Sequence, residues 1–533
     1  MSQGLFVGVD VGTGSARAAL VTAEGKVLAT ATKNIQIWTP RPHFAEQSSE
    51  DIWSAVCQAT KNVLKGQDAR NVKGIGFDAT CSLVALDKTG QPISISPTGA
   101  NQQNIIMWMD HRAEEEIKVV NATKNKVLDF VGGKISLEMQ IPKLLWLKNK
   151  FGAEFFKKVD HFFDLPDFLT WKATGVTSRS LCSLVCKWTY QVEEHHKNGF
   201  WDREFFDQVG LGDLKSEQIG LDVRMPGSVI GTLTSEAAAQ LGLTSEVKVG
   251  TSLIDAHAGA LGMIGCNAAG TTTNFVERLG LICGTSSCHM AVSEKCLFVP
   301  GVWGPYFSAV LPDLWLSEGG QSATGRLLDH VIQSHPARDN FKDKNLNEIP
   351  AELNKILESI PATDLTSNLH IVPDFHGNRS PLADSTRKGM MSGLDFDTST
   401  TSLATLYLAT IQAIAYGTKH IYETLQKHGH KLNVALMCGG LAKNPVFVQT
   451  TSDVLEMPVL LPEEPESVLL GAAILGATAA GAFPTVHQAA ISMGGAATKI
   501  LPQPTTQEFH RKKYKVFLKM LDDQAKYKEM MSE

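Results

Sequence analysis

Residues 8–17, GVDVGTGSAR, end an apolar run with one carboxylate and continue with glycines and hydroxyls. Residues 5–11 are almost continuously apolar, which is typical of a strand buried on both faces. Residues 16–21 and 27–32 predict two further strands. The glycine-rich segment is therefore predicted to form a hairpin loop. A P-loop or a dinucleotide fingerprint would instead run from a strand into a helix.

The same pattern returns about half a chain later. Residues 277–287, ERLGLICGTSS, again end an apolar run with glycine, threonine and serine, and residues 289–292 predict the next strand. Gly12-Thr13 and Gly284-Thr285 thus stand near the start of each half, which favours an internal duplication. Two α/β domains are expected, each opening with a strand–loop–strand unit and meeting within residues 250–275.

Other stretches fit this α/β organisation. A helix is expected at residues 50–65 with Ser49 as its N-cap, and buried strands at 72–80 and 247–254. The uncharged run 467–487 predicts a close-packed internal helix, because glycines and a proline interrupt it too often for a membrane span. The predicted units are an N-terminal domain (1–262), a C-terminal nucleotide-binding domain (263–500) and a helical tail (501–533).

Composition excludes several classes of protein. The chain has 533 residues, 20% of them charged, and a net charge of −6, which is an ordinary multi-domain globular profile. No basic tract is long enough to follow a nucleic-acid backbone, and residues 511–513 are interpreted as a solvated helix face. No export signal or membrane-spanning segment is predicted, so a cytoplasmic protein is expected.

The cysteines predict no structural metal. There are nine, scattered without CxxC pairs, which favours a reducing compartment. Cys182 and Cys186 are four positions apart, but only His195 and His196 lie near them in the sequence. Because a buried cysteine commonly acts as a small hydrophobe, no metal site is predicted there.

The two glycine-rich loops suit phosphate. Their backbone N–H groups, with the hydroxyls of Thr13 and Ser15, can cradle phosphate oxygens. Asp10 would be costly to bury unpaired, so it either caps its own turn or holds a hydrated Mg²⁺ bound to phosphates. Gly439-Gly440 follow a predicted strand, where a flat group can approach the backbone closely, although a plain tight turn gives the same pattern.

These motifs belong to a pattern that spans most of the chain. It consists, in order, of VGVDVGTGSAR (7–17), KLLWLKN (143–149), LIDAHAG (253–259), CGTSS (283–287), EGGQSATG (318–325), GNRSP (377–381), GMMSGL (389–394), CGGLAKN (438–444) and ESVLLGAA (466–473). The pattern resembles the FGGY carbohydrate kinases, the family of glycerol kinase, xylulokinase and ribulokinase. The resemblance implies two ribonuclease H-like (actin-type) domains around a central cleft, with ATP and Mg²⁺ as cofactors.

Two segments resemble one branch of this family. GFDATCSLV (76–84) and WMDHRA (108–113) are most similar to the D-ribulokinases, which implies conversion of D-ribulose to D-ribulose 5-phosphate. L-Ribulose and D-xylulose are the alternative acceptors. Gln140 and Thr405 depart from the family's two usual signatures, which bears on the sub-family and not on the family.

The resemblance also implies residue roles. Asp255 matches the catalytic aspartate and is expected to be the general base, with a helix N-cap as the alternative. Arg112 is expected to bind the sugar, or else to pair with the adjacent Glu114, Glu115 and Glu116. The expected sugar-binding residues are Thr80, Cys81, Ser82, Asp110, His111, Arg112 and Asp255. The expected phosphate- and nucleotide-binding residues are Gly12, Thr13, Gly14, Ser15, Arg17, Gly284, Thr285, Gly320, Gln321, Gly439, Gly440 and Asn444, with Asp10 holding Mg²⁺.

Two other classes of function remain open at this point. One is an actin-like nucleotide-binding chaperone or filament protein, and the other is a sugar sensor without turnover. Asp10, Thr13 and Asp255, together with the sugar segments, favour the kinase. The expected partner is a small sugar, with no nucleic acid and no membrane, and a homodimer is one option for the assembly.

Overall fold

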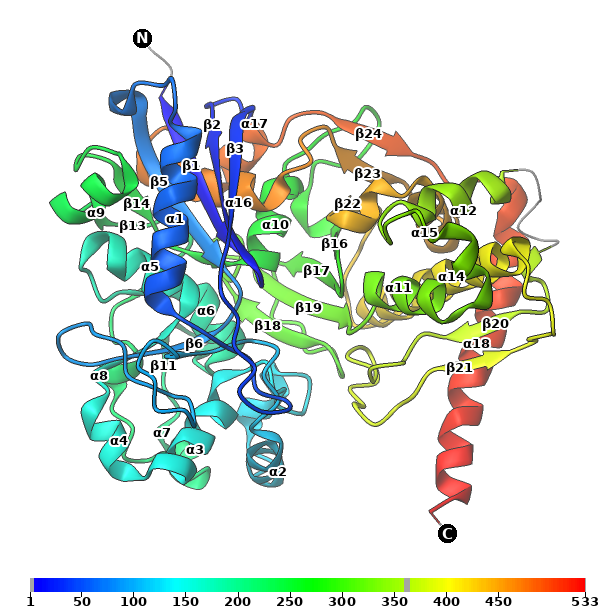
Figure 1. Cartoon of the computed structure of the whole chain (residues 1–533), viewed down its shortest axis with the longest axis horizontal. Coiled ribbons are helices and arrows are strands. Elements are labelled where there is room, and N and C mark those ends of the chain that lie inside the picture. Colours follow the sequence, from blue (N-terminus) through cyan, green and yellow to red (C-terminus); the bar gives the residue numbers. More distant parts are fainter. Residues whose placement is uncertain (1–3, 359–364, 533) are drawn as a thin grey trace.

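The computed structural model describes residues 4–358 and 365–532. The first predicted domain begins at residue 1 and the predicted helical tail finishes at residue 533, and both of these ends lie outside the described residues. Two bodies lie side by side, and each is built on a mixed β-sheet (Figure 1). No helix of the described residues combines the length and apolarity that crossing a membrane requires.

The first sheet carries the predicted hairpin. β1 (Leu5–Val11) and β2 (Ser15–Val21) pair antiparallel, and the Gly12 N–H donates to the Ser15 carbonyl to close the turn. The strand order is β13-β14-β5-β1-β2-β3, in which β5 runs parallel to β1. The remaining bounds are β3 (Val27–Asn34), β5 (Val72–Ala79), β13 (Val229–Thr232) and β14 (Lys248–Gly250).

The second sheet repeats this topology. β16 (Arg278–Cys283) and β17 (Ser287–Ser293) form the second hairpin, closed by the Gly284 N–H donating to the Ser286 carbonyl. The order β19-β17-β16-β22-β23-β24 has the same strand directions as β3-β2-β1-β5-β14-β13, which confirms the predicted duplication. The other bounds are β18 (Trp303–Phe307), β19 (Trp315–Gln321), β22 (Val434–Cys438), β23 (Val459–Pro462) and β24 (Ala497–Ile500).

The helix α16 (Ser467–Ala479) belongs to the second half of the chain but packs on the first sheet (Figure 1). Glycines on β1 and β5 make this possible. A Cβ on Gly8 would lie 2.0 Å from the Leu469 carbonyl oxygen, and one on Gly76 would lie 1.9 Å from that of Ala472. Only glycine fits such an approach, so the helix backbone rests directly on the strands.

The helix α10 (Asp255–Ile264) pairs with α16 in the same close manner. A Cβ on Gly471 would lie 1.9 Å from the Ala258 carbonyl oxygen, and one on Gly262 equally far from that of Ser467. The predicted single helix 467–487 is corrected, because a turn at residues 480–485 separates α16 from α17 (Val486–Met493).

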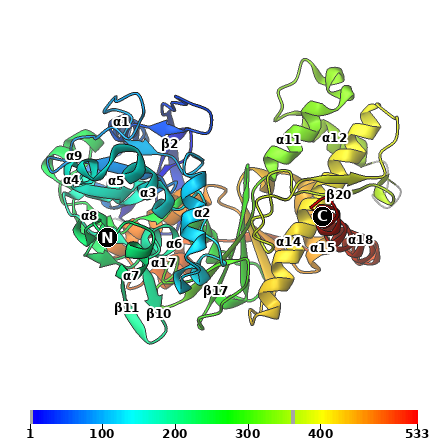
Figure 2. The ribbon, with the colours of Figure 1, turned by 90° about the horizontal axis from the view of Figure 1, so that it is seen from below.

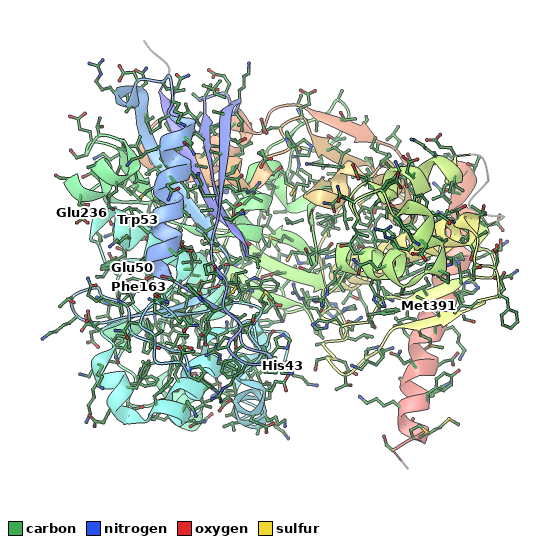
Figure 3. The ribbon with its side chains drawn as sticks, viewed as in Figure 1. His43, Glu50, Trp53, Phe163, Glu236 and Met391 are labelled. Atoms are coloured by element: carbon green, nitrogen blue, oxygen red, sulfur yellow. The ribbon has the colours of Figure 1, made fainter. Side chains whose placement is uncertain are left out.

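The opposite face of the first sheet is apolar. Val7, Val9 and Val11 pack with α1 (Ser49–Val63), and Figure 3 shows Trp53 on this helix. Its N-cap is Ser48, one residue before the predicted cap, because the Ser48 Oγ accepts the Asp51 N–H. Further helices on this face are α5 (Leu165–Thr174) and α9 (Ser235–Leu241), and those on the second sheet are α11 (Gly325–Ser334), α12 (Ile349–Leu357), α14 (Thr400–Lys427) and α15 (Pro445–Leu455).

Two local predictions need correction. The strand expected at residues 247–254 is divided into β14 and β15 (Leu253–Ile254), and Asp255 is already the first residue of α10. The basic run 511–513 lies on α18 (Pro504–Met530), at the outer side of the second body (Figure 2). Lys513 is not solvated, because it is buried and its Nζ donates to the Thr366 and Leu369 carbonyls.

We predict that Gly76→Ala destabilises the protein by about 1–3 kcal/mol or more, since the new methyl group overlaps the α16 backbone. Gly231→Ala on β13 is the matched control, because its Cβ would meet no atom closer than 3.6 Å. Urea unfolding of both variants is the measurement. Equal midpoints for Gly76→Ala and Gly231→Ala would contradict the backbone contact.

Candidate active site

Three carboxylates meet at the carboxyl ends of neighbouring strands. Asp10 on β1 and Asp78 on β5 are register partners, because these strands run parallel. β15 pairs with the other side of β5 and places Leu253 opposite Asp78, so that Asp255 follows at the same edge. In α/β sheets this edge is where ligands bind.

Arg17 links Asp10 to the second half of the chain. Its Nε and Nη2 donate to Asp10 Oδ2 at 2.8 and 2.6 Å, and its Nη1 donates to Glu466 Oε2 at 2.7 Å. Glu466 immediately precedes α16. The guanidinium is half-buried, so it holds the phosphate loop, the strand end and the start of α16 together.

Asp78 is a site residue that the sequence patterns did not predict. It is fully buried, and no N–H or hydroxyl of the described residues donates to its carboxyl oxygens, whereas a hydrogen bond with the Asp10 carboxylate stabilises its protonated form. Burial raises its pKa well above the usual range, and the neighbouring Asp10 charge raises it further. The sequence signal for Asp78 was a carboxylate near the end of the predicted buried strand 72–80. Its neighbour Asp10 could not be predicted from nearby sequence, because strand pairing brings the two together.

Asp255 stands half-buried at the first turn of α10. Burial and the Asp10 charge raise the pKa of its carboxyl to about 7. Its Oδ1 accepts the Ala256 N–H at 2.7 Å, which orients the side chain at the helix start. The N-cap alternative is wrong, because Ile254 occupies the N-cap position and Asp255 is the first residue inside α10. Its weakly acidic carboxyl stands where proton transfer is feasible at neutral pH.

The first phosphate loop is anchored from outside the hairpin. The Trp108 Nε1–H donates to Thr13 Oγ1 at 3.1 Å, and the Gln47 amide donates to the Thr13 carbonyl at 2.9 Å. The Gly14 carbonyl accepts the Ile35 N–H. The loop of Gly12, Thr13, Gly14 and Ser15 is thereby connected to the WMDHRA segment.

The second loop is held against the start of α11. The Gly284 carbonyl accepts the Thr324 hydroxyl at 3.1 Å and the Gly325 N–H at 3.1 Å, and the Thr285 carbonyl accepts the Arg326 N–H at 3.2 Å. These hydrogen bonds engage the loop carbonyls and hold the loop against the start of α11.

Two of the expected nucleotide-binding side chains serve the protein instead. Gln321 is buried and its amide donates to the Ile414 carbonyl and the Thr418 hydroxyl, both on α14. Asn444 caps α15 through Oδ1 and donates to the Tyr407 hydroxyl at 2.6 Å. Direct contact of these side chains with a nucleotide is therefore revised to support of the surrounding backbone.

The glycines of this region have different surroundings. Gly439 has a φ of +92°, and a Cβ there would lie 2.4 Å from the Cys283 carbonyl oxygen. Gly440 has no atom within 4 Å of its Cβ position, so its backbone is open to a flat group. Gly320 lies within the buried strand β19, where a Cβ would meet Arg379.

The segment 80–82 is buried beside the first loop. The Thr80 and Ser82 hydroxyls are 3.3 Å apart, and Ser82 Oγ accepts the Trp108 N–H. Cys81 is buried, which raises the pKa of its thiol. His111 is half-buried, and its ring lies 6.1 Å from that of His376 in the second half of the chain.

Asp110 and Arg112 form a saturated internal network. Arg112 donates to both carboxylate oxygens of Asp110 and to Glu46 Oε1, at 2.7 to 2.8 Å, and all three side chains are fully buried. Asp110 also accepts the Ala45 N–H. Direct sugar binding by Asp110 and Arg112 is therefore revised to a structural role, and Arg112 pairs with Glu46 and not with Glu114, Glu115 or Glu116.

A second charged cluster, not assigned from the sequence, joins the two halves. Lys187 on α6 (Leu181–Lys187) lies 3.8 Å from Glu318 Oε2, and His257 Nε2 lies 3.6 Å from the same oxygen. Nearby, Arg379 donates to Glu138 Oε1 at 2.6 Å. Glu318 Oε2 has no hydrogen-bond partner among the described residues.

The protonation of this cluster depends on its charges. Burial is the largest influence on the pKa of Glu318 and raises it, but the charges of Lys187, His257 and Arg379 together bring it below its usual value. Burial is likewise the largest influence on the pKa of Lys187 and lowers it, but Glu318 and its other acidic neighbours together raise it. Burial lowers the pKa of His257 to about 4, so its ring is neutral at pH 7. The sequence carried a partial signal for this cluster. The motif EGGQSATG contains Glu318, the motif LIDAHAG contains His257, and Lys187 ends a short apolar helix.

Duplicated α/β bodies, each with a glycine loop, and a carboxylate cluster at the edge of the first sheet fit a nucleotide-dependent phosphotransferase. Family models agree in detail: residues 5–262 match the N-terminal domain of the FGGY family of carbohydrate kinases, and residues 279–480 match its C-terminal domain. The chain belongs to this FGGY family and is an ATP-dependent carbohydrate kinase. The chaperone or filament alternative is thereby excluded.

Individual relatives cover nearly the whole chain. A human FGGY carbohydrate kinase domain-containing protein is 50% identical over 99% of this chain and 98% of its own length. A D-ribulokinase of Saccharomyces cerevisiae is 39% identical over 90% of this chain and 72% of its own length. The crystal structure of a ligand-bound xylulose kinase from Lactobacillus acidophilus has a TM-score of 0.81 at 20% identity, covering 98% of both chains, which shows the shared actin-type fold.

We predict that Arg112→Leu destabilises the protein by about 3–5 kcal/mol, because it leaves Asp110 and Glu46 as uncompensated buried carboxylates. Arg70→Leu, which breaks an exposed pair with Asp68, is the control and should leave stability unchanged. Denaturant unfolding measures both. A stable Arg112→Leu variant with only a raised KM for sugar would restore the sugar-binding role.

Proposed function

We propose that this kinase phosphorylates a pentulose, with D-ribulose as its best substrate and the 5-hydroxyl as the acceptor. The observation that carries the proposal is the buried Lys187–Glu318 pair beside Asp255. The yeast D-ribulokinase and a Staphylococcus aureus ribulokinase, 29% identical over 91% of this chain, support the substrate class. L-Ribulose and D-xylulose are the alternative acceptors.

The Lys187–Glu318 pair has the character of a polyol site. At 3.8 Å the two charges attract but do not form a direct hydrogen bond, and Glu318 Oε2 is left without a partner among the described residues. A sugar hydroxyl can donate to the carboxylate and accept from the ammonium at the same time. Since a buried oxygen without a hydrogen-bond donor is costly, this charged pair gains most from a ligand with several hydroxyls.

Asp255 is the proposed general base. As the 5-hydroxyl oxygen attacks the γ-phosphorus, the carboxylate takes the hydroxyl proton, and the bond from phosphorus to the bridging oxygen of ADP breaks. A pKa of about 7 suits this task, because the group can both accept and release a proton near neutral pH. Asp255 lies on α10 together with His257, which faces Glu318.

The two glycine loops and Arg17 are proposed to hold the phosphates. Asp10 suits Mg²⁺, which prefers carboxylate, water and phosphate oxygens, because it ends β1 directly before the first glycine loop. When bound, Mg²⁺ would supply neutralisation of the phosphate charge. The open backbone at Gly440 and the turn at Gly439 would accept the flat base of the nucleotide.

Wider properties are inferred from the same assignment. We infer that residues 1–262 bind mainly the sugar and that residues 263–500 bind mainly the nucleotide, with 501–533 as a helical tail. All nine cysteines are free thiols, which supports a cytoplasmic location. The proposed partner is the small sugar substrate, and a homodimer stays one option for the assembly.

Asp255→Asn is expected to lower kcat by about 10²–10⁴-fold and to leave the Kd for sugar nearly unchanged, since the amide cannot take a proton. Asp129→Asn at the exposed surface is the control and should behave as wild type. Coupled ADP-release kinetics and sugar titration measure the two quantities. A near-normal kcat for Asp255→Asn would contradict the general-base assignment and leave Asp255 only a structural role at the start of α10.

The substrate proposal predicts an order of kcat/KM. D-Ribulose should be best, L-ribulose and D-xylulose weaker, and glycerol very poor, because a site built for hydroxyls rejects analogues lacking them by up to about 10⁴–10⁵. Steady-state rates of the four compounds at saturating Mg-ATP decide it. If glycerol or D-xylulose equals or exceeds D-ribulose, the D-ribulokinase assignment is wrong and only that of an FGGY sugar kinase survives. No ADP release with any sugar would favour the sensor alternative.

A further inference from the structure

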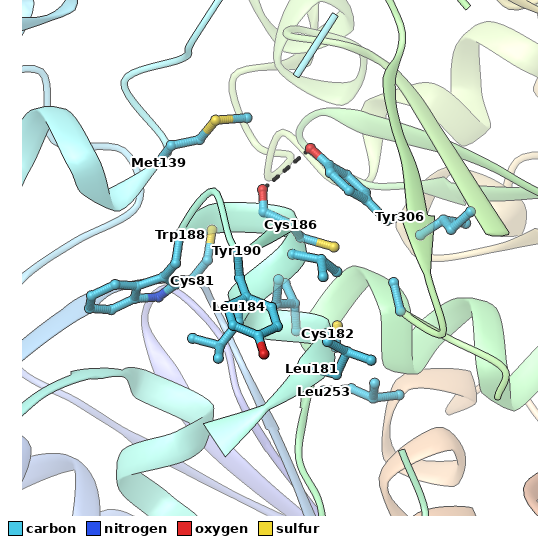
Figure 4. Packing of buried hydrophobic residues seen from close by; sticks show 14 of the residues in the cluster. Cys81, Met139, Leu181, Cys182, Leu184, Cys186, Trp188, Tyr190, Leu253 and Tyr306 are labelled. Carbon is cyan, nitrogen blue, oxygen red and sulfur yellow. Dashed lines mark hydrogen bonds between the residues drawn. The ribbon is translucent and has the colours of Figure 1, made fainter. Parts of the chain in front are cut away.

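Cys182 and Cys186 face a histidine that the sequence does not place near them. They lie one turn apart on the buried helix α6 (Figure 4), and His257 approaches from α10. The two sulfurs and a His257 ring nitrogen all lie within 4.8 Å of one another, and Cys186 Sγ is 3.3 Å from His257 Nε2. His195 and His196, the neighbours in sequence, are not part of this group.

A carboxylate lies beside this group, near its histidine, but is not among the atoms that all lie within 4.8 Å of one another. Glu318 Oε2 lies 3.6 Å from His257 Nε2, its side chain is 3% exposed, and it has no hydrogen-bond partner among the described residues. In a tetrahedral zinc site with bonds of about 2.0–2.3 Å, ligand atoms stand about 3.3–3.8 Å apart. The two measured separations of 3.3 and 3.6 Å fall within this interval.

We propose that Cys182, Cys186 and His257 bind one Zn²⁺ ion, that Glu318 moves in from beside His257 as the fourth ligand, and that this ion inhibits the kinase. Thiolate and imidazole ligands select zinc over magnesium, so the site is distinct from the carboxylates Asp10 and Asp78. Binding displaces two thiol protons, and the resulting charge of two thiolates, one carboxylate and Zn²⁺ is −1, which Lys187 balances from 3.8 Å.

The inhibition has a direct structural cause. Zinc takes Glu318 away from the proposed sugar pocket and fixes His257, which is two residues beyond Asp255 on the same helix. The inhibitory part therefore rests on the proposed function, whereas the metal binding does not. Sugar and zinc should compete, because both require Glu318 Oε2.

Cobalt is the probe for the site itself. Titration of the full metal-free chain with Co²⁺, in a phosphine reductant, should give the near-ultraviolet absorption of cobalt–thiolate bonds at one ion per chain. Cys182→Ser should weaken this binding by more than about 10–100-fold, the loss typical of even an outer-shell partner. Cys57→Ser on α1 is the matched thiol control and should bind as wild type.

A surface group provides the second control. His43, His111 and Glu114 also lie within 4.8 Å of one another but are partly or fully exposed, and Figure 3 shows His43. His43→Ala should keep both the thiolate absorption and the stoichiometry. If Cys182→Ser binds Co²⁺ as wild type does, or if His43→Ala abolishes binding, the buried site is wrong. Thermal unfolding of Cys182→Ser confirms that the variant is folded.

Kinetics test the inhibition. Zn²⁺ should raise the apparent KM for D-ribulose at fixed Mg-ATP without changing kcat, and Cys182→Ser should need at least about tenfold more zinc for the same effect. Inhibition that is equal in Cys182→Ser and wild type would overturn the inhibitory role. If no sugar is phosphorylated at all, the proposed function fails, while the cobalt titration still decides the metal site.

Discussion

The contact between α16 and the first sheet is the constraint on which the rest of the structure depends. Gly8 and Gly76 let the helix backbone approach the strands to a distance that any Cβ would block, and Gly262 and Gly471 do the same between α10 and α16. This contact brings Glu466 to Arg17 and sets α10, with Asp255 at its start, beside the strand ends. A helix from one half of the chain thus positions the reactive groups of the other.

Pairing alone does not separate the structural buried charges of this protein from the proposed binding ones. Arg112 donates to both carboxylate oxygens of Asp110 and to one oxygen of Glu46 at 2.7 to 2.8 Å, which holds the fold. Among the described residues, one carboxylate oxygen each of Glu46, Asp164, Asp167 and Glu318 is nevertheless buried without a hydrogen-bond donor. What distinguishes Glu318 is its place, because it lies 3.8 Å from Lys187 and both charges act on Asp255.

Local patterns predicted the hairpin loops, the duplicated domains and the position of Asp255, because strand periodicity and turn residues act over a few positions. They did not predict Asp78 as the partner of Asp10, since strand register joins residues far apart in the chain. Lys187, Glu318 and the His257–Cys186 contact come together only when α6, β19 and α10 pack. Gln321 and Asn444 were assigned to the nucleotide because the sequence cannot show that α14 and α15 already engage their side chains.

The most direct test of the proposed sugar site is the binding of D-ribulose, without nucleotide, to wild type and to Lys187→Met. Removing a hydrogen bond from a charged group typically loses about 1.5–3 kcal/mol, which corresponds to a Kd raised about 10–150-fold. Isothermal titration calorimetry on variants shown to be folded should give that loss for Lys187→Met. An unchanged Kd would contradict the claim that the unsatisfied Lys187–Glu318 pair is the sugar site.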